Sequence, residues 1–303
     1  MKSYKIENDH LIWCMSSENQ PAVCVESGDI IVLDTRDCFG SQPIKAGDGP
    51  LEFNEELAGN PATGPVFVDG AVPGDVLKVE ILEITPTSTV IMGMGKDMGV
   101  FADEVEREAT RIFEIEDEKT LFNAKLQIKN RPMLGVIGTA PADGTKIDNI
   151  TPGAHGGNMD CRRIIAGSTV YLPVNTEGAL LALGDVHAVM GDGEVSSGGA
   201  EVAAEVKIKV TVIRGKYYEC PMVISEGYAM TLSSCMTLDE AAEQAAKAMR
   251  RFIQKSFGIP HWEACMLLSL VGDLRICQVV DPLKTCRMEV PLNVFEAYEY
   301  HFE

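Results

Sequence analysis

The segment Ala204-Glu205-Val206-Lys207-Ile208-Lys209-Val210 points to the fold class, because apolar and charged residues alternate along it without a break. A period of two places the apolar side chains on one face of a strand and the charged ones on the other. The same alternation recurs in Leu77-Lys78-Val79-Glu80-Ile81. We expect both segments to be strands with one face in a core and one face in water.

Turn residues punctuate the N-terminal part of the chain, at sites such as Asp69-Gly70 and Pro73-Gly74-Asp75. Many short strands separated by such turns are typical of a β-sandwich or barrel rather than of a parallel βαβ array. We therefore predict a mainly β catalytic domain over residues 1–225. Two similar segments, residues 70–76 and 178–186, fit duplicated β units, although a shared hairpin chemistry explains them equally well.

The composition changes in the C-terminal part of the chain. Thr237-Leu238-Asp239-Glu240 has the form of a capping box, and apolar residues follow at helical spacing, which predicts a helix over 238–256. Acidic residues open this helix and basic residues close it, as the helix dipole favours. A second helix is expected over 261–271 and a strand over 275–280. We predict a smaller α/β cap over residues 226–303, packed into the same globule.

The charge balance and the cysteines restrict the partners and the compartment. The 303 residues include 26 Lys and Arg against 45 Asp and Glu, a formal net charge of −19. Such a surface repels phosphate backbones and anionic lipid, so nucleic acid is not expected as a partner. No stretch approaches the ~20 apolar residues that cross a membrane, so no membrane partner is expected. The nine cysteines show no C-x-x-C pair, which indicates reduced thiols in a cytoplasmic protein.

Two glycine-rich segments combine a histidine with a carboxylate. They are Gly153-Ala154-His155-Gly156-Gly157-Asn158-Met159-Asp160-Cys161 and Gly184-Asp185-Val186-His187-Ala188-Val189-Met190-Gly191-Asp192-Gly193-Glu194. Glycine lets the chain bend so that both side chains aim at one point. Imidazole and carboxylate suit Zn²⁺ and similar cations. We expect the two segments to meet and to hold one cation, although two turns with solvated acids are the simpler interpretation.

Two further segments carry candidate site residues. Asp34-Thr35-Arg36-Asp37-Cys38-Phe39 follows an apolar strand and places carboxylates at its end, where a surface Asp–Arg pair is the simpler interpretation. Asn60-Pro61-Ala62-Thr63-Gly64-Pro65 is a stiff irregular loop, because proline fixes φ and restricts the residue before it. Loops of this kind frame pockets or merely turn corners.

These segments resemble signature blocks of the acetamidase/formamidase family. Six blocks in the family's order carry the resemblance, over roughly residues 20 to 270: residues 60–68, 133–141, 155–160, 167–174, 184–194 and 198–201. The resemblance implies a jelly-roll-like β fold, a homodimer, a cytoplasmic location and an associated divalent metal. It also implies a small amide substrate of the formamide or acetamide type, hydrolysed to a carboxylate and ammonia.

Position in these blocks suggests His155, Asp160 and His187 as metal ligands, and the resemblance adds Asp37 from the Thr35-Arg36-Asp37 segment. We expect Zn²⁺ as the first choice and Ca²⁺ as the second. A bound Zn²⁺ lowers the pKa of its water toward ~7, which makes hydroxide available at neutral pH.

Residues near the expected metal ligands are candidates for the general base, the oxyanion contacts and the substrate contacts. Glu194, or failing that Asp192 or Glu201, is the candidate base that takes the proton of the attacking water and passes it to nitrogen. The N–H groups of Gly156 and Gly157 can approach the oxyanion, because no Cβ blocks them. The residues expected against the substrate are Asn60, Thr63 and Glu201.

Two other functions fit the same residues. Cys161 lies near His155 in sequence, and Cys-His pairs hydrolyse amides, although a buried small thiol is the simpler interpretation. A non-catalytic β-sandwich that binds Ca²⁺ or a solute through acidic loops fits the net charge. However, Asp192-Gly193-Glu194 lacks the spacing of a calcium loop, and oxygen ligands without histidine are typical of Ca²⁺ sites.

Overall fold

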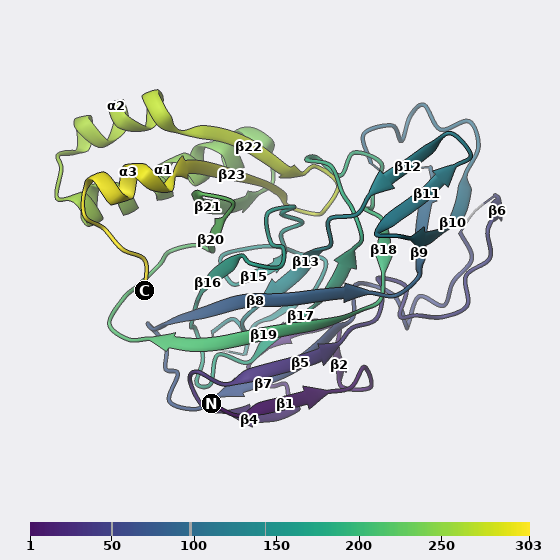
Figure 1. The fold of residues 1–303 in the computed structure, drawn as a ribbon, viewed down its shortest axis with the longest axis horizontal. Coiled ribbons are helices and arrows are strands. Elements are labelled where there is room, and N and C mark those ends of the chain that lie inside the picture. Colours follow the sequence, from purple (N-terminus) through teal and green to yellow (C-terminus); the bar gives the residue numbers. More distant parts are fainter. Residues whose placement is uncertain (50, 97–98, 143) are drawn as a thin grey trace.

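The structure is a computed structural model that describes residues 1–49, 51–96, 99–142 and 144–303. It is mostly β, with 42% strand and 13% helix, which confirms the predicted fold class. Figure 1 shows the strands in the body of the molecule and the helices, coloured green to yellow, gathered at one end. The strands form two large sheets and one small pair within the described residues.

The first sheet joins strands from both ends of the chain. Its order is β1 (Ser3–Ile6), β5 (Ile30–Asp34), β19 (Ala204–Ile213), β8 (Val76–Pro86), β16 (Thr169–Pro173), β20 (Met222–Ser225), β21 (Tyr228–Cys235), β23 (Lys284–Pro291) and β22 (Asp273–Gln278). Neighbouring strands are antiparallel, except that β1 and β5 are parallel. β19 therefore lies between β5 and β8 and pairs with both.

The second sheet carries most of the site. Its main path is β12 (Leu126–Lys129), β11 (Lys119–Asn123), β10 (Ala109–Glu116), β9 (Thr89–Met94), β18 (Glu201–Val202), β17 (Leu181–His187), β13 (Met133–Gly138) and β15 (Gly156–Asn158). Beside this path, β7 (Ala62–Val68) pairs with β17, β2 (Leu11–Ile12) and β4 (Val23–Val25), and β6 (Gly47–Asp48) pairs with β10. The small pair consists of β3 (Cys14–Ser16) and β14 (Lys146–Asp148).

The two large sheets share one hydrophobic core. Val79 of β8, Val206 of β19 and Leu183 of β17 are fully buried in it. The charged residues that alternate with them face outward, where Lys209 Nζ lies 3.2 Å from Glu80 Oε2. The predicted division of β8 and β19 into a core face and a water face is confirmed.

Two turns carry the chain between the sheets in opposite directions. One connects β7 to β8 and the other connects β16 to β17. They are hydrogen-bonded to each other, since Gly74 N–H donates to the Val174 carbonyl and Gly178 N–H donates to the Ala71 carbonyl. These are the two segments that resemble each other in sequence, and each is a crossover between the sheets.

The helices are α1 (Leu238–Phe257), α2 (His261–Val271) and α3 (Leu292–Ala297). The hydroxyl of Thr237 accepts the Glu240 N–H at the start of α1, and Gly258 ends this helix in the left-handed region. Both predicted helices are present at their expected places. The predicted strand over 275–280 is β22, which both begins and ends two residues earlier, since Asp273 pairs with Glu289 of β23 and the strand ends at Gln278.

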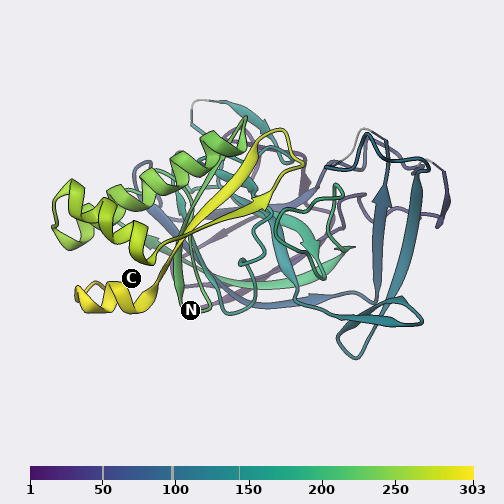
Figure 2. The same cartoon turned by 90° about the horizontal axis from the view of Figure 1, so that it is seen from above.

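The C-terminal part is built onto the first sheet. β21, β23 and β22 extend this sheet beyond β20, so the predicted boundary at residue 225 falls at the turn of the β20–β21 hairpin. α1 packs its buried face, with Ala241, Ala245 and Met249, against β21 and β23. Figure 2 shows the helices at one end of the molecule and the strands β9 to β12 at the other.

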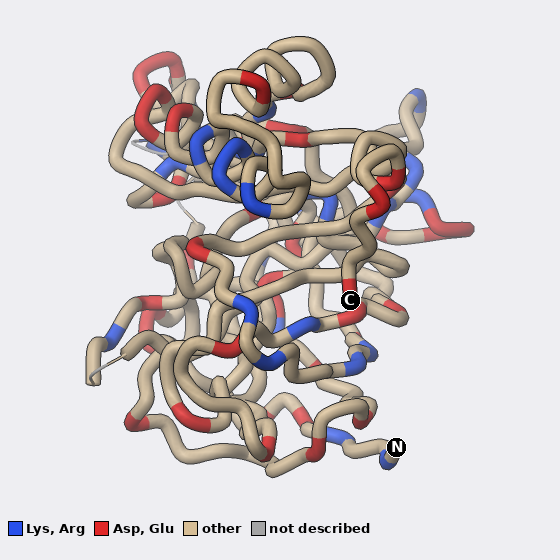
Figure 3. Tube along the Cα trace, turned by 90° about the vertical axis from the view of Figure 1, so that its left-hand side faces the viewer, with Lys and Arg blue, Asp and Glu red and all other residues tan. Residues whose placement is uncertain are grey.

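Acidic residues outnumber basic ones along the chain. Figure 3 shows basic residues interspersed with the more numerous acidic ones along the chain. Among the described residues, no helix is both long and apolar enough to cross a membrane.

Candidate active site

β17 and β18 position the centre of the site. His187 ends β17 and lies opposite Glu201 of β18, so that His187 Nε2 is 3.2 Å from Glu201 Oε1. Asp185 precedes His187 by two residues on the same strand, and this spacing favours one face for both side chains. His187 Nε2 is 3.6 Å from Asp185 Oδ1. The imidazole therefore lies between two carboxylates.

Two loops bring further carboxylates to this imidazole. Asp160, which follows β15, places its Oδ1 3.8 Å from His187 Nδ1. Glu194, from the loop after β17, places its Oε1 4.0 Å from His187 Nε2. One donor atom from each of Asp160, His187 and Glu194 lies within 4.8 Å of the others. The two glycine-rich segments thus meet through these three residues.

A second group of three adjoins the first. Cys38, Asp185 and Glu201 also place donor atoms within 4.8 Å of one another. We call the combined set the central cluster, which consists of Cys38, Asp160, Asp185, His187, Glu194 and Glu201. Sequence reasoning did not select Cys38 or Asp185. For Asp185 a signal existed, because its spacing of two from His187 predicts a shared face if the segment is a strand.

Two glycines leave the space that the cluster occupies. A Cβ at Gly135 of β13 would lie 2.5 Å from Asp160 Oδ1 and 2.6 Å from Asp185 Oδ2. A Cβ at Gly199 would lie 2.5 Å from His187 Nδ1. Because Cβ atoms do not approach other heavy atoms this closely, the cluster requires glycine at both positions.

Several residues that carry these carboxylates have unusual backbone conformations. Asp160, Asp185 and Glu194 have φ values of 42°, 53° and 48°, in the left-handed region that residues with a Cβ seldom adopt. Asn60, which contacts Asp185, has a φ of 56°. Conformations of this kind cost about 1–3 kcal/mol each and cluster at functional sites. Four of the twelve non-glycine residues with positive φ in the described part of the chain thus carry or contact the carboxylates.

Many buried atoms of the cluster have no hydrogen-bond partner. Within the described residues these atoms are Asp160 Oδ1 and Oδ2, Asp185 Oδ1, His187 Nδ1 and Nε2, Glu194 Oε2 and Glu201 Oε2. An unpaired buried polar group costs about 1–3 kcal/mol, and a charged one more. Carboxylate oxygens, imidazole nitrogen and a nearby thiol form a donor set that suits a divalent cation such as Zn²⁺. The residues present therefore fit a metal ion.

Burial controls the protonation of the cluster. Burial, followed by repulsion from other carboxylates, raises the pKa of Asp160 and of Glu194 well above the usual range. Burial raises the pKa of Glu201 to about 7, against the opposite effect of His187. Burial alone would lower the pKa of His187, but Glu201 and Asp185 raise it well above its usual value. The cluster thus favours a positive charge at its centre.

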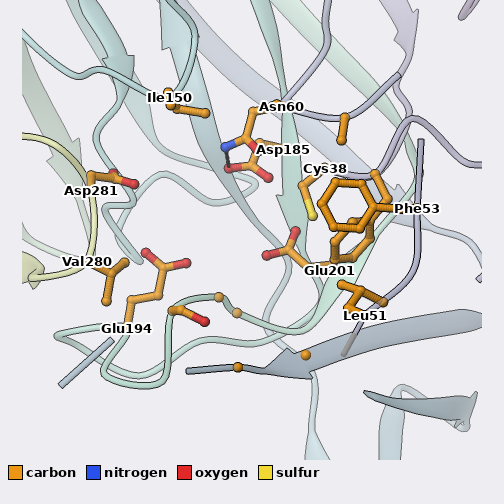
Figure 4. A pocket seen from close by; sticks show the side chains of 18 of the residues that line it. Cys38, Leu51, Phe53, Asn60, Ile150, Asp185, Glu194, Glu201, Val280 and Asp281 are labelled. Atoms are coloured by element: carbon orange, nitrogen blue, oxygen red, sulfur yellow. Dashed lines mark hydrogen bonds between the residues drawn. The ribbon is translucent and has the colours of Figure 1, made fainter. Parts of the chain in front are cut away.

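The cluster opens onto a cavity of about 640 Å³ through Cys38, Asp185, Glu194 and Glu201, whereas Asp160 and His187 are buried behind them (Figure 4). Asn60 Nδ2 donates to Asp185 Oδ2 over 2.8 Å at the rim of the cluster. Across the cavity Asn158 Nδ2 donates to Asp281 Oδ2 over 3.1 Å. Asp281 comes from the C-terminal part, where no motif pointed to it, and sequence reasoning missed it. The cavity thus brings together residues from both ends of the chain.

A family of known proteins matches nearly the whole chain. The sequence pattern of the Acetamidase/Formamidase family matches residues 15–149 and 144–297. The chain belongs to the acetamidase/formamidase family. The resemblance seen in the six sequence blocks is confirmed.

Solved structures of acetamidase/formamidase relatives share the complete fold. A predicted acetamidase/formamidase from Thermoanaerobacter tengcongensis is 41% identical, with a TM-score of 0.94 and 100% of both chains covered. An acetamidase from Bacillus halodurans is 40% identical, with a TM-score of 0.94 over 97% of this chain and 99% of that one. An acetamidase from Yersinia enterocolitica is 28% identical, with a TM-score of 0.89 over 96% of this chain and 92% of that one.

Two residues suggested from the sequence lie outside the central cluster of this acetamidase/formamidase family member. The carboxylate of Asp37 accepts the N–H groups of Phe39 and Ser41, at 2.9 and 3.0 Å, and so closes its own turn. Thr63 is fully buried in β7, and its hydroxyl donates to the Asp34 carbonyl over 2.8 Å. Both side chains have structural partners, and neither lines the cavity.

Asp192 and the two glycines are also placed away from the cavity. Asp192 accepts two hydrogen bonds from the buried guanidinium of Arg287, at 2.7 and 2.8 Å. The N–H of Gly156 donates to the Gly153 carbonyl over 3.1 Å, so it is already paired. Neither Gly156 nor Gly157 lines the cavity.

His155 stands apart from the cluster as well. It is buried, and no Asp or Glu oxygen of the described residues lies within 4 Å of its ring nitrogens. Burial lowers the pKa of His155 to about 4, so its ring is neutral at pH 7. Of the two histidines in the glycine-rich segments, the structure places His187 at the centre.

The thiols near the site differ in their placement. Cys161 is fully buried, does not line the cavity and lies in the environment of Cys277 and Arg287. Cys38 lines the cavity, but burial, followed by the charge of Glu201, raises the pKa of its thiol well above the usual value. A protonated thiol is a weak nucleophile, so this environment does not activate Cys38.

Proposed function

We propose that the protein hydrolyses short linear amides to a carboxylate and ammonia at the central cluster, with a divalent cation held by Asp160, His187 and Glu194. Membership of the acetamidase/formamidase family supports the reaction class. The observation that carries the cation is the set of buried oxygen and nitrogen atoms without hydrogen-bond partners. A cation would supply the missing interactions of both glycine-rich segments at once.

The donor set favours Zn²⁺ over Ca²⁺. The imidazole of His187 is a ligand typical of Zn²⁺, whereas Ca²⁺ takes six to eight oxygen ligands. When bound, a Zn²⁺ ion supplies a Lewis acid that polarises a carbonyl oxygen and lowers the pKa of water toward ~7. The homodimer and the cytoplasmic location remain predictions.

Glu201 is the proposed general base. It lines the cavity, its Oε2 has no partner among the described residues, and burial raises its pKa to about 7. A carboxylate at this place can take a proton from the attacking water and return it to the departing nitrogen. Sequence reasoning placed Glu194 first in this role, but its contact with Asp160 and His187 favours it as a ligand.

Asn158 is the proposed contact for the amide nitrogen. Its Nδ2 is held by Asp281, and its Oδ1 is buried without a partner among the described residues. This oxygen can accept an N–H of the substrate and so orient the amide toward the cluster. An oriented substrate reacts faster because the entropy of alignment is lost on binding.

The test combines metal analysis of the purified protein with ammonia release from formamide and acetamide. We expect His187→Ala and Asp160→Asn to lose both the metal and the activity. Glu201→Gln should keep the metal and lose about 10²- to 10⁴-fold in kcat. The matched control is His10→Ala, because His10 is exposed and lies outside the cavity.

Two outcomes would contradict the proposal. Full metal content in both His187→Ala and Asp160→Asn would remove these residues from the ligand set. Undiminished ammonia release after complete removal of the metal would reject the cation altogether.

A further inference from the structure

One side of the cavity is an apolar wall that the chemistry of the cluster does not require. We define the aromatic wall as Phe39, Leu51 and Phe53, all of which line the cavity. Figure 4 shows Leu51 and Phe53 on the side of Cys38 and Glu201, and Ile150 and Val280 on the opposite side. Because Cys38 immediately precedes Phe39, the aromatic wall begins at the cluster itself.

The aromatic wall is held in place by contacts of its own. The rings of Phe39 and Phe53 pack with centroids 5.6 Å apart. Gln42 Nε2 donates to the Asn54 carbonyl over 3.1 Å, and Asn54 N–H donates back to Gln42 Oε1 over 2.6 Å. These reciprocal bonds fix the backbone next to Phe53. The aromatic wall is therefore an ordered surface that faces the cavity.

The cavity is much larger than acetamide. A water molecule takes about 30 Å³ in the liquid, so the four heavy atoms of acetamide take on the order of 100 Å³. The cavity volume is about 640 Å³, within the range of sites that bury far larger ligands. Formamide or acetamide would leave most of the aromatic wall in contact with water.

The aromatic wall favours an apolar part of a bound molecule, and the central cluster favours a polar part. Phe53 is 39% exposed and Ile150 is 38% exposed, so large apolar side chains remain open to the cavity. Removing such surfaces from water favours binding of an apolar group. Asp185, Glu194 and Glu201 line the same cavity, so the polar end of a bound molecule would face the central cluster.

We infer that the preferred substrate is a neutral primary amide whose acyl group is apolar and larger than acetyl, such as a branched, longer-chain or aryl-bearing group. This inference rests on the proposed amide hydrolysis. The carbonyl lies at the cluster, and the apolar acyl group contacts Phe53, Leu51 and Ile150. Hydrolysis of formamide and acetamide is then the weaker activity of the same site.

The test measures kcat/KM by ammonia release from formamide, acetamide, butanamide, hexanamide and phenylacetamide. A single methylene in a hydrophobic pocket changes kcat/KM by about 10- to 200-fold. We therefore expect kcat/KM for phenylacetamide or hexanamide to exceed that for acetamide at least tenfold. Phe53→Ala should reduce the ratio of kcat/KM for phenylacetamide to kcat/KM for acetamide at least tenfold.

The matched control is Phe122→Ala, since Phe122 of β11 is 45% exposed and lies outside this cavity. It should keep the wild-type preference, and a thermal melt of each variant checks that it is folded. The inference is overturned if kcat/KM is flat or falls with acyl size, or if Phe53→Ala lowers all amides equally. No ammonia from any amide would instead contradict the proposed function.

Discussion

Gly135 leaves the space into which two carboxylates of the cluster fit. In Gly135→Ala the new Cβ would push Asp160 and Asp185 from their places, because it would lie 2.5 and 2.6 Å from their oxygens. A displacement of about 1 Å in a reacting group costs on the order of 100-fold. We expect kcat/KM for acetamide to fall by about this factor in an ammonia-release assay.

Gly47→Ala is the control for this change, because a Cβ at Gly47 meets no atom within 4 Å. It should keep the activity within twofold. Wild-type activity and metal content in Gly135→Ala would show that the two carboxylates can move without cost.

The buried imidazole of His155 makes stability depend on pH. Its pKa is about 4 in the folded protein, and ~6.5 is the usual value in an unfolded chain. Between these values the unfolded chain binds a proton that the folded protein does not. The free energy of unfolding therefore falls as the pH drops from 6.5 to 4, by about 1.4 kcal/mol per pH unit.

Urea unfolding of the wild-type protein and of His155→Gln at pH 7 and pH 5 measures this effect. Other groups titrate equally in both proteins and cancel in the difference. The wild-type protein should lose about 2 kcal/mol more than the variant between the two pH values. If both proteins lose the same free energy of unfolding between pH 7 and pH 5, His155 is accessible to protons in the folded state.

At the residue scale the sequence predicted only part of the site. Asp160, His187, Glu194 and Glu201 were selected because histidine, acids and glycine lie close together in the chain. His155 and His187 were both expected as ligands, because the sequence does not show which ring the tertiary structure turns toward the carboxylates. Asp281 could not be found, because only the folding of the C-terminal part brings it to the cavity.

β23 is tied to the loop of Glu194 by one buried guanidinium. Arg287 of β23 is 1% exposed, and it binds Asp192 through two nitrogens and Glu289 through Nε at 2.7 Å. In Arg287→Met, Glu289 would remain buried and would lose its contact with the Arg287 guanidinium. Breaking a buried pair from one side lowers the free energy of unfolding by about 3–5 kcal/mol.

Arg275→Met is a matched control for this prediction. Arg275 lies opposite Arg287 on β22 but is exposed, and its pair with Asp273 is on the surface. Such a pair contributes at most about 1 kcal/mol. Equal urea midpoints for the two variants would show that the buried network adds no stability.

At the element scale the local patterns predicted β8, β19, α1 and α2, because a period of two or of 3.6 depends on neighbours in the chain. The order of the strands could not be predicted in this way. β19 pairs with β5, about 170 residues before it, and no local pattern encodes that partner. Local patterns also could not predict the two crossovers between the sheets, although the sequences of these crossovers resemble each other.

A bound cation would stabilise the whole molecule as well as the site. Asp160 and Glu194 come from separate segments, so a shared ion would connect these parts of the fold. A ligand at 100 times its Kd stabilises the folded state by about 2.7 kcal/mol. We expect a strong chelator to lower the melting temperature and added Zn²⁺ to restore it.

Asp160→Asn serves as the comparison, since it weakens the proposed ligand set, and its melting temperature should respond less to the chelator. The prediction fails if protein that has demonstrably lost its metal melts at the same temperature as untreated protein.

The central place of β19 in the first sheet also bears on biosynthesis. Translation proceeds from the N-terminus, so β5 and β8 leave the ribosome long before residues 204–213, which fill the gap between them. Until that strand emerges, both of its partners present free edges and apolar faces. The nascent chain therefore carries these unpaired edges from the emergence of β8, which ends at Pro86, until β19 begins at Ala204.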